Sequence, residues 1–137
     1  MQKEALLTKS LLYQDVSLLN PSLFVYDIPA LVKKMKKKRS WAKGKLNVMI
    51  LLKTPDKQIV LTTLHEETEI ESFQSNDSIT FQVIKGKLTF NSRKKSVMLD
   101  KGQLLTIHEN IKYSLITDEE TVLLMTISGN SLQLSVN

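Results

Sequence analysis

The sequence predicts an all-β fold of the sandwich or barrel type, preceded by one short amphipathic helix. From residue 46 onward, short segments are rich in Val, Ile, Leu, Thr and Phe, which favour strands. Turn residues separate these segments at intervals of about ten residues, and no helical periodicity intervenes. Such a pattern is typical of an antiparallel sandwich or barrel. The chain of 137 residues has the size of one domain, and its 42% hydrophobic content is ordinary for a globular protein.

Nine segments are predicted as strands, and six of them are followed by a turn sequence. In one of them, Ile79–Ile84, the odd-numbered positions up to Val83 are apolar, so they are expected to face the core. The predicted strands are Leu46–Lys53, Lys57–Leu64, Thr68–Phe73, Ile79–Ile84, Lys87–Asn91, Ser96–Leu99, Gln103–Ile107, Tyr113–Thr117 and Thr121–Ser128.

The part of the chain before the strands is predicted to hold an arm and one helix. Asp27 suits a helix N-cap, with Pro29 in the first turn. An apolar stripe then predicts a helix from Asp27 to about Lys38, formed by Ile28, Leu31, Val32 and Met35. Residues 1–26 contain three leucine pairs and are expected to pack on the barrel or on a second subunit. We therefore divide the chain into residues 1–45, the arm and basic helix, and 46–137, the barrel.

The net charge of +5 arises from one segment. Residues 33–45 hold eight of the nineteen basic residues and no acid, whereas the rest of the chain carries 11 basic and 14 acidic residues. Lysine-rich segments bind phosphates by releasing counterions, so anion or nucleic-acid binding through residues 33–45 is one hypothesis. Trp41 is the only tryptophan, and the aromatic side chains typical of single-strand binders are missing. Nucleic acid is therefore a less favoured partner, and Trp41 is expected to pack where the helix meets the barrel.

Other function classes lack the residues that they need. The chain has no cysteine, which excludes disulfides and thiolate sites. No apolar run approaches the ~20 residues of a membrane span, and the first residues do not resemble a signal peptide. We expect a cytoplasmic protein with no membrane partner. Neither a Ser–His–Asp order nor a glycine-rich phosphate loop is present.

Two stretches resemble the glycine-containing motifs of the cupin family. They are FQVIKGKLTF (Phe81–Phe90) and LDKGQLLTIHENIKYSLIT (Leu99–Thr117), and the resemblance covers about half of the chain. It implies a cupin-type double-stranded β-helix, or jelly-roll barrel, with an N-terminal arm. Cupins commonly pair through sheet faces and exchanged arms, so the resemblance also implies a homodimer.

The metal-binding positions of the cupin motifs are not matched. If Gly86 ends the first motif, the glutamate ligand falls at Ile79. The two histidines then fall at Ser72 or Phe73 and at Gln74 or Ser75. If Gly102 begins the second motif, its histidine ligand falls at Tyr113. A transition metal needs about three or four imidazole or carboxylate donors at one point. The resemblance therefore implies a cupin-like protein without a metal cofactor.

The barrel lumen is the candidate ligand site. Its lining would form a mostly apolar pocket with a few orienting polar groups. Alternatively, the side chains simply fill a small barrel. The residues placed there by the resemblance are Phe73, Gln74, Ser75, Ile79 and Tyr113. The main hypothesis is thus a metal-free, small-molecule-binding or structural module, with enzymatic activity left open.

A metalloenzyme with a non-standard site is the alternative hypothesis. It would use His65 and His108 together with nearby glutamates. The favoured interpretation is that both histidines lie in loops and that the glutamates form a solvent-facing row, with Glu67, Glu69 and Glu71 sharing one strand face. The glutamates concerned are Glu66, Glu67, Glu69 and Glu71.

Overall fold

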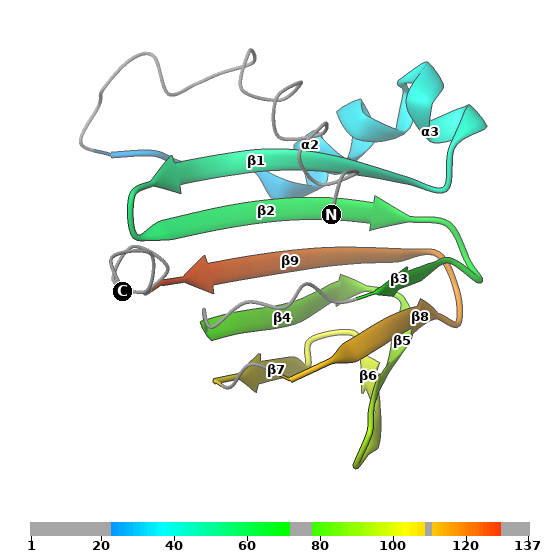
Figure 1. The fold of residues 1–137 in the computed structure, drawn as a ribbon. Helices are drawn as coiled ribbons and strands as arrows, with labels where there is room; N and C mark the ends of the chain where they lie inside the picture. The colour runs from blue at the N-terminus through cyan, green and yellow to red at the C-terminus, as the bar shows by residue number, and fades with distance from the viewer. Residues whose placement is uncertain (1–22, 72–77, 109–110, 130–137) are drawn as a thin grey trace.

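The computed structural model describes residues 23–71, 78–108 and 111–129, and Figure 1 shows their arrangement. Two helices precede nine strands in this part of the chain. The helices are α2 (Ile28–Lys36) and α3 (Arg39–Lys43), and the strands are β1 (Leu46–Thr54), β2 (Lys57–Leu64), β3 (Glu69–Glu71), β4 (Ser78–Lys85), β5 (Lys87–Ser92), β6 (Ser96–Asp100), β7 (Leu104–Ile107), β8 (Tyr113–Thr117) and β9 (Thr121–Ser128). The predicted all-β architecture is confirmed, and each strand overlaps the segment that was predicted for it.

The strands form two antiparallel sheets. The five-stranded sheet has the order β1-β2-β9-β4-β7, and the four-stranded sheet has the order β3-β8-β5-β6. Along the chain, consecutive strands change sheet repeatedly, and two of these crossings run from β4 to β5 and from β8 to β9. These two crossings place the β4–β5 corner beside the β8–β9 turn, which ties the sheets together at one end.

The main core lies between the two sheets. Strand β4 contributes Ile79, Phe81 and Val83, whose exposed fractions are 4%, 0% and 0%. The predicted inward face of this strand is therefore confirmed. Side chains from both sheets complete this cluster: Leu64, Leu88, Phe90, Leu99, Ile107, Tyr113, Leu115 and Leu123.

A second core lies on the outer face of the five-stranded sheet, under helix α2. Met35 is only 1% exposed and packs with Leu51, Leu61 and Val122. The helix starts as predicted, because the Asp27 carboxylate accepts a hydrogen bond from the Ala30 amide. Figure 1 shows both helices over the β1–β2 side of this sheet. The apolar stripe of α2 is thus buried against the sheet of the same chain.

The predicted single helix is interrupted. Helix α2 ends at Lys36. The amides of Lys37 and Lys38 then donate hydrogen bonds to carbonyl oxygens three residues earlier, as in a 3₁₀ turn, and the α-helix does not continue. Lys38 is extended (ψ 149°), and α3 restarts at Arg39. The break lets Trp41 turn inward, where it is 8% exposed. None of the helices in the described part of the chain is long and apolar enough to cross a bilayer.

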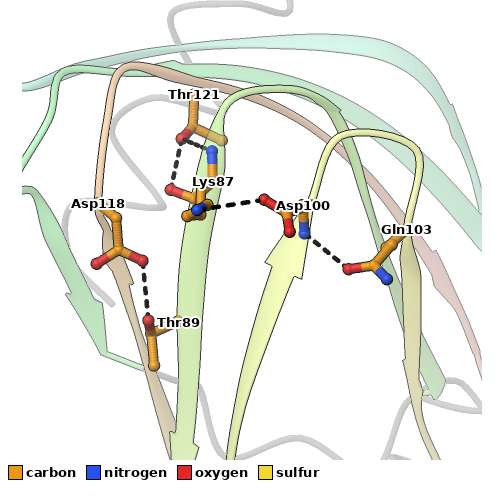
Figure 2. A network of polar contacts seen from close by, with 6 residues as sticks. All are labelled: Lys87, Thr89, Asp100, Gln103, Asp118 and Thr121. Carbon is orange, nitrogen blue, oxygen red and sulfur yellow. Dashed lines mark hydrogen bonds and ion pairs between the residues drawn. The ribbon is translucent and has the colours of Figure 1, made fainter.

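Gly86 forms the corner at which β4 passes into β5. Its φ is +96°, which L side chains rarely adopt. A Cβ at this position would lie 2.3 Å from the Glu120 carbonyl oxygen and 2.7 Å from the Thr121 Cα. Figure 2 shows how the corner is held: the Thr121 hydroxyl accepts from the Lys87 amide at 3.3 Å and lies 3.1 Å from the Lys87 carbonyl oxygen. Only glycine fits between the β4–β5 corner and the β8–β9 turn.

Candidate functional site

The two candidate ligand residues that the structure describes lie in the core between the sheets. Ile79 is 4% exposed and Tyr113 is 7% exposed. The Tyr113 ring stacks on Phe90, with centroids 5.3 Å apart, and meets the Phe81 ring edge-on at 5.6 Å. Aromatic pairs at these distances add to the hydrophobic stabilisation of a core. The other three candidates, Phe73 to Ser75, lie outside the described residues, so the ligand-binding role of the five stays a prediction.

The donor chemistry at these positions does not fit a divalent metal. Ile79 stands where the cupin resemblance places a glutamate ligand, and its side chain has no donor atom. Tyr113 stands at a histidine position, and its ring is packed between two phenylalanines. Within residues 23–71, 78–108 and 111–129, no three His, Asp or Glu side chains gather closely enough to hold a metal ion. The described residues therefore do not fit a resident metal ion.

The alternative metal site with both histidines is wrong, because they lie at opposite ends of the five-stranded sheet. His65 follows Leu64, whose partner on β9 is Thr121. His108 follows the last residue of β7, beside Ser78 at the other end of β9. The eight-residue strand β2 spans the distance between these ends, which is about 23 Å. No single ion can contact both imidazoles.

His65 has a structural role at the base of helix α3. Its ring stacks on Trp41 with centroids 3.5 Å apart and an interplanar angle of 13°. Its Nε2 lies 2.7 Å from the Trp41 carbonyl oxygen, so Nε2 donates in this contact. The prediction that Trp41 packs where the helical segment meets the barrel is confirmed, and His65 is the partner that the sequence did not reveal.

The glutamates between residues 66 and 71 are exposed, as the favoured interpretation predicted. Glu67 has a φ of +59° and lies in the turn before β3, so only Glu69 and Glu71 share a strand face. The predicted row of three is therefore wrong in one member.

Residues 33–45 form the end of α2, the link to α3, α3 itself and the two residues after it. They carry a concentration of positive charge, which we call the basic helical surface. Lys36 pairs with Glu120 of the β8–β9 turn. Of the cations between residues 33 and 45, it alone has an ion pair among the described residues. The basic helical surface consists of Lys33, Lys34, Lys37, Lys38, Arg39, Lys43 and Lys45, all of them exposed or half-exposed.

Neither a protein-family model nor a curated protein matches the sequence. Solved structures do match. A cupin-2 domain protein from Shewanella frigidimarina superposes with a TM-score of 0.61 at 15% identity, over 77% of this chain and 95% of that chain. A cupin superfamily protein from Desulfitobacterium hafniense has a TM-score of 0.60 at 10% identity, over 63% and 79%. This chain has the cupin fold. The jelly-roll prediction is thereby confirmed.

The likeness to solved structures at such low identity shows the fold alone. A conserved protein of unknown function from Streptococcus pyogenes has a TM-score of 0.62 at 14% identity, over 80% of this chain and 90% of that chain. At this identity, the two cores share architecture but few side chains. The function must therefore be argued from the residues of this chain.

Proposed function

We propose that this chain is a metal-independent binding module with the cupin fold, which takes a small molecule at the mouth of its barrel. One observation carries the proposal: both described positions that correspond to metal ligands, Ile79 and Tyr113, belong to a hydrocarbon and aromatic cluster. An apolar site with few polar groups suits a small organic ligand better than a hydrated ion.

The chemistry of the lumen favours an apolar ligand with one polar group. Tyr113 brings a hydroxyl into a cluster otherwise made of aliphatic and phenyl groups. Phe81 and Phe90 hold its ring on two sides, so the orientation of the hydroxyl is fixed by packing. Phe73, Gln74 and Ser75 are proposed to line the mouth near this ring, as the resemblance implies.

Native mass spectrometry of the untagged protein tests the proposal. We expect no stoichiometric metal after incubation with Mn²⁺, Fe²⁺, Ni²⁺ or Zn²⁺ followed by desalting. We also expect an added mass that corresponds to a retained organic ligand. One tightly held metal per chain would overturn the metal-independent reading.

Two tyrosine variants locate the ligand. Tyr113→Phe removes a hydroxyl from the lumen, whereas Tyr26→Phe removes one from the outer side of β1, where Tyr26 donates to the Leu51 carbonyl oxygen. We expect Tyr113→Phe to reduce ligand retention and Tyr26→Phe to leave it unchanged. Equal retention by the wild type and both variants would place the ligand outside the lumen.

We also propose that the protein is a cytoplasmic homodimer. Leu23 and Val25 are 78% and 88% exposed, and they follow the leucine-rich residues 1–22. Exposed apolar side chains in such a run favour burial against a second copy. Light scattering after size exclusion should give twice the 15.6 kDa mass of one chain. A monomer at tens of micromolar would contradict the dimer.

A further inference from the structure

We infer that the basic helical surface binds the phosphate backbone of double-stranded nucleic acid without reading its sequence. The site is separate from the barrel lumen, because α2 and α3 lie on the outer face of the five-stranded sheet (Figure 1). The inference therefore does not depend on the proposed small-molecule site.

Within the described part of the chain, acidic side chains leave most of the charge on this surface without an ion pair. No acidic residue occurs between Asp27 and Asp56, so the whole helical segment and strand β1 carry only positive charges. Glu120 neutralises Lys36 from the β8–β9 turn. The seven cations of the basic helical surface have no ion pair in the described part of the chain. An uncompensated cluster of this size attracts a polyanion and releases its counterions.

The backbone that carries these cations is held rigidly. The Asn47 side chain on β1 donates to the Met35 carbonyl oxygen at 3.0 Å and accepts from the Ser40 hydroxyl at 2.8 Å. It therefore pins the end of α2 and the start of α3 to the sheet. The stacked Trp41 and His65 rings fix α3 a second time. A fixed platform loses less conformational entropy on binding than a flexible lysine tail would.

The aromatic chemistry disfavours single strands as the ligand. Proteins that bind single strands stack bases on exposed aromatic rings. Trp41 is the only aromatic residue between positions 33 and 45, and it is 8% exposed. His65 covers it by stacking, and the Lys36 Nζ lies 5.7 Å from its ring centroid. Because no ring between positions 33 and 45 is open to a base, contacts to the phosphates of a duplex are the favoured mode.

The burial of α2 disfavours a membrane as the ligand. Amphipathic helices bind bilayers by inserting their apolar face. Here that face already packs on the sheet, with Met35 1% exposed and Leu31 and Val32 partly buried. The large exposed apolar side chains of the described residues all lie outside positions 33–45: Leu23, Phe24, Val25, Met98 and Leu104. The basic helical surface therefore carries positive charge but no large exposed apolar side chain that could insert into a bilayer.

Fluorescence anisotropy with a labelled duplex of about 20 base pairs and arbitrary sequence tests the inference at several salt concentrations. The test variant is Lys37→Gln, Lys38→Gln and Arg39→Gln combined. Lys38 caps α3 without a side-chain hydrogen bond, so its replacement spares the helix. The matched control replaces Arg93, Lys94 and Lys95 by Gln. These exposed residues of the β5–β6 turn have the same composition, so both variants lose three positive charges.

The salt dependence gives the expected magnitude. If all seven cations met phosphates, log K would fall with log salt with a slope of about −6, since each contact contributes about −0.9. The test variant should flatten the wild-type slope by about 2.7 and weaken binding more than about 10-fold at 50 mM salt. The control variant should bind within about twofold of the wild type, because long-range charge alone is largely screened.

Four results would overturn the inference. Binding that survives high salt would exclude a phosphate-backbone mode. Equal losses in the two variants would show that net charge, and not this surface, attracts the duplex. Tighter binding to a single strand than to the duplex would require an exposed stacking ring. Binding to vesicles that contain phosphatidylserine, with no binding to the duplex, would assign the surface to a membrane.

Discussion

Replacing Gly86 by alanine tests whether the contact between the β4–β5 corner and the β8–β9 turn holds the two sheets together. The substitution adds one methyl group at a residue with a φ of +96°. Gly102 provides a control. Its φ is +87°, yet a Cβ there would meet nothing within 4 Å. Both variants suffer the same kind of backbone strain, and only Gly86→Ala collides with backbone atoms.

The two costs can be worked out separately. Holding alanine at a positive φ costs about 1–3 kcal/mol at either glycine. At Gly86 the new Cβ would lie 2.3 Å from the Glu120 carbonyl oxygen, so the β8–β9 turn must move by about 1 Å to reach an ordinary contact. Overpacking of this kind adds about 1–3 kcal/mol. The same movement strains the Thr121 contacts with Lys87 (Figure 2). We expect a total loss of about 2–6 kcal/mol for Gly86→Ala and about 1–3 kcal/mol for Gly102→Ala.

Urea denaturation followed by the emission of Trp41, the only tryptophan, measures both losses. The m-values should stay equal if each variant unfolds in two states. The reasoning would be refuted if the two variants lost the same free energy of unfolding, because the collision with the β8–β9 turn would then have no cost. It would also be refuted if Gly102→Ala were the less stable variant.

Two further predictions concern the polar contacts on the outer face of the five-stranded sheet. Asn47→Ala removes the side chain that bonds Met35 and Ser40, so the free energy of unfolding should fall by about 2–3 kcal/mol. The control Asn91→Ala removes a side-chain contact with Ser96 only, so it should lower the free energy of unfolding by less than about 1 kcal/mol. Equal losses of stability for the two variants in urea would show that Asn47 does not hold the helices to the sheet. Burial raises the pKa of Tyr26 above its usual 10.0, so the neutral hydroxyl is favoured in the folded state. The unfolded chain then releases this proton at lower pH, and the contribution of Tyr26 to stability is present below about pH 10 and decreases above it. The stability gap between wild type and Tyr26→Phe should therefore narrow between pH 8 and pH 11, and a gap that widens would contradict the assignment.

The strands were predictable because their signal is local. In β4 the alternation of apolar and polar residues gives the inward face directly, and the turn glycines mark the corners. The end of helix α2 was not predictable, because the lysines that follow it are good helix formers. The helix stops at Lys36 because Trp41 must reach His65, which lies 24 positions further along the chain. The end of this helix is therefore set by a tertiary contact and not by local helix propensity.

The candidate sites divide in the same way. His65 lies next to a run of glutamates in the sequence, and that proximity suggested a metal site. The turn at Glu67 and the stacking on Trp41 separate these groups in space. By contrast, the basic segment was recognised from its composition alone. The attachment of this segment to the sheet through Asn47 could not be predicted, because the sequence does not indicate which groups a single asparagine in a strand will bond.

The determinants of fold and of metal chemistry are therefore separate in this chain. Gly86 remains because the backbone of another turn passes within van der Waals contact of it. That requirement comes from the backbone and does not depend on what the barrel binds. Ile79 occupies a position from which a carboxylate would face the lumen, where a charge without a metal partner would be costly to bury. An isoleucine there instead contributes about 1.5–3 kcal/mol of hydrophobic stabilisation. An apolar side chain at this position therefore stabilises the barrel more than a carboxylate would, and the cations of residues 33–45 lie on the outer face, where they leave the interior unchanged.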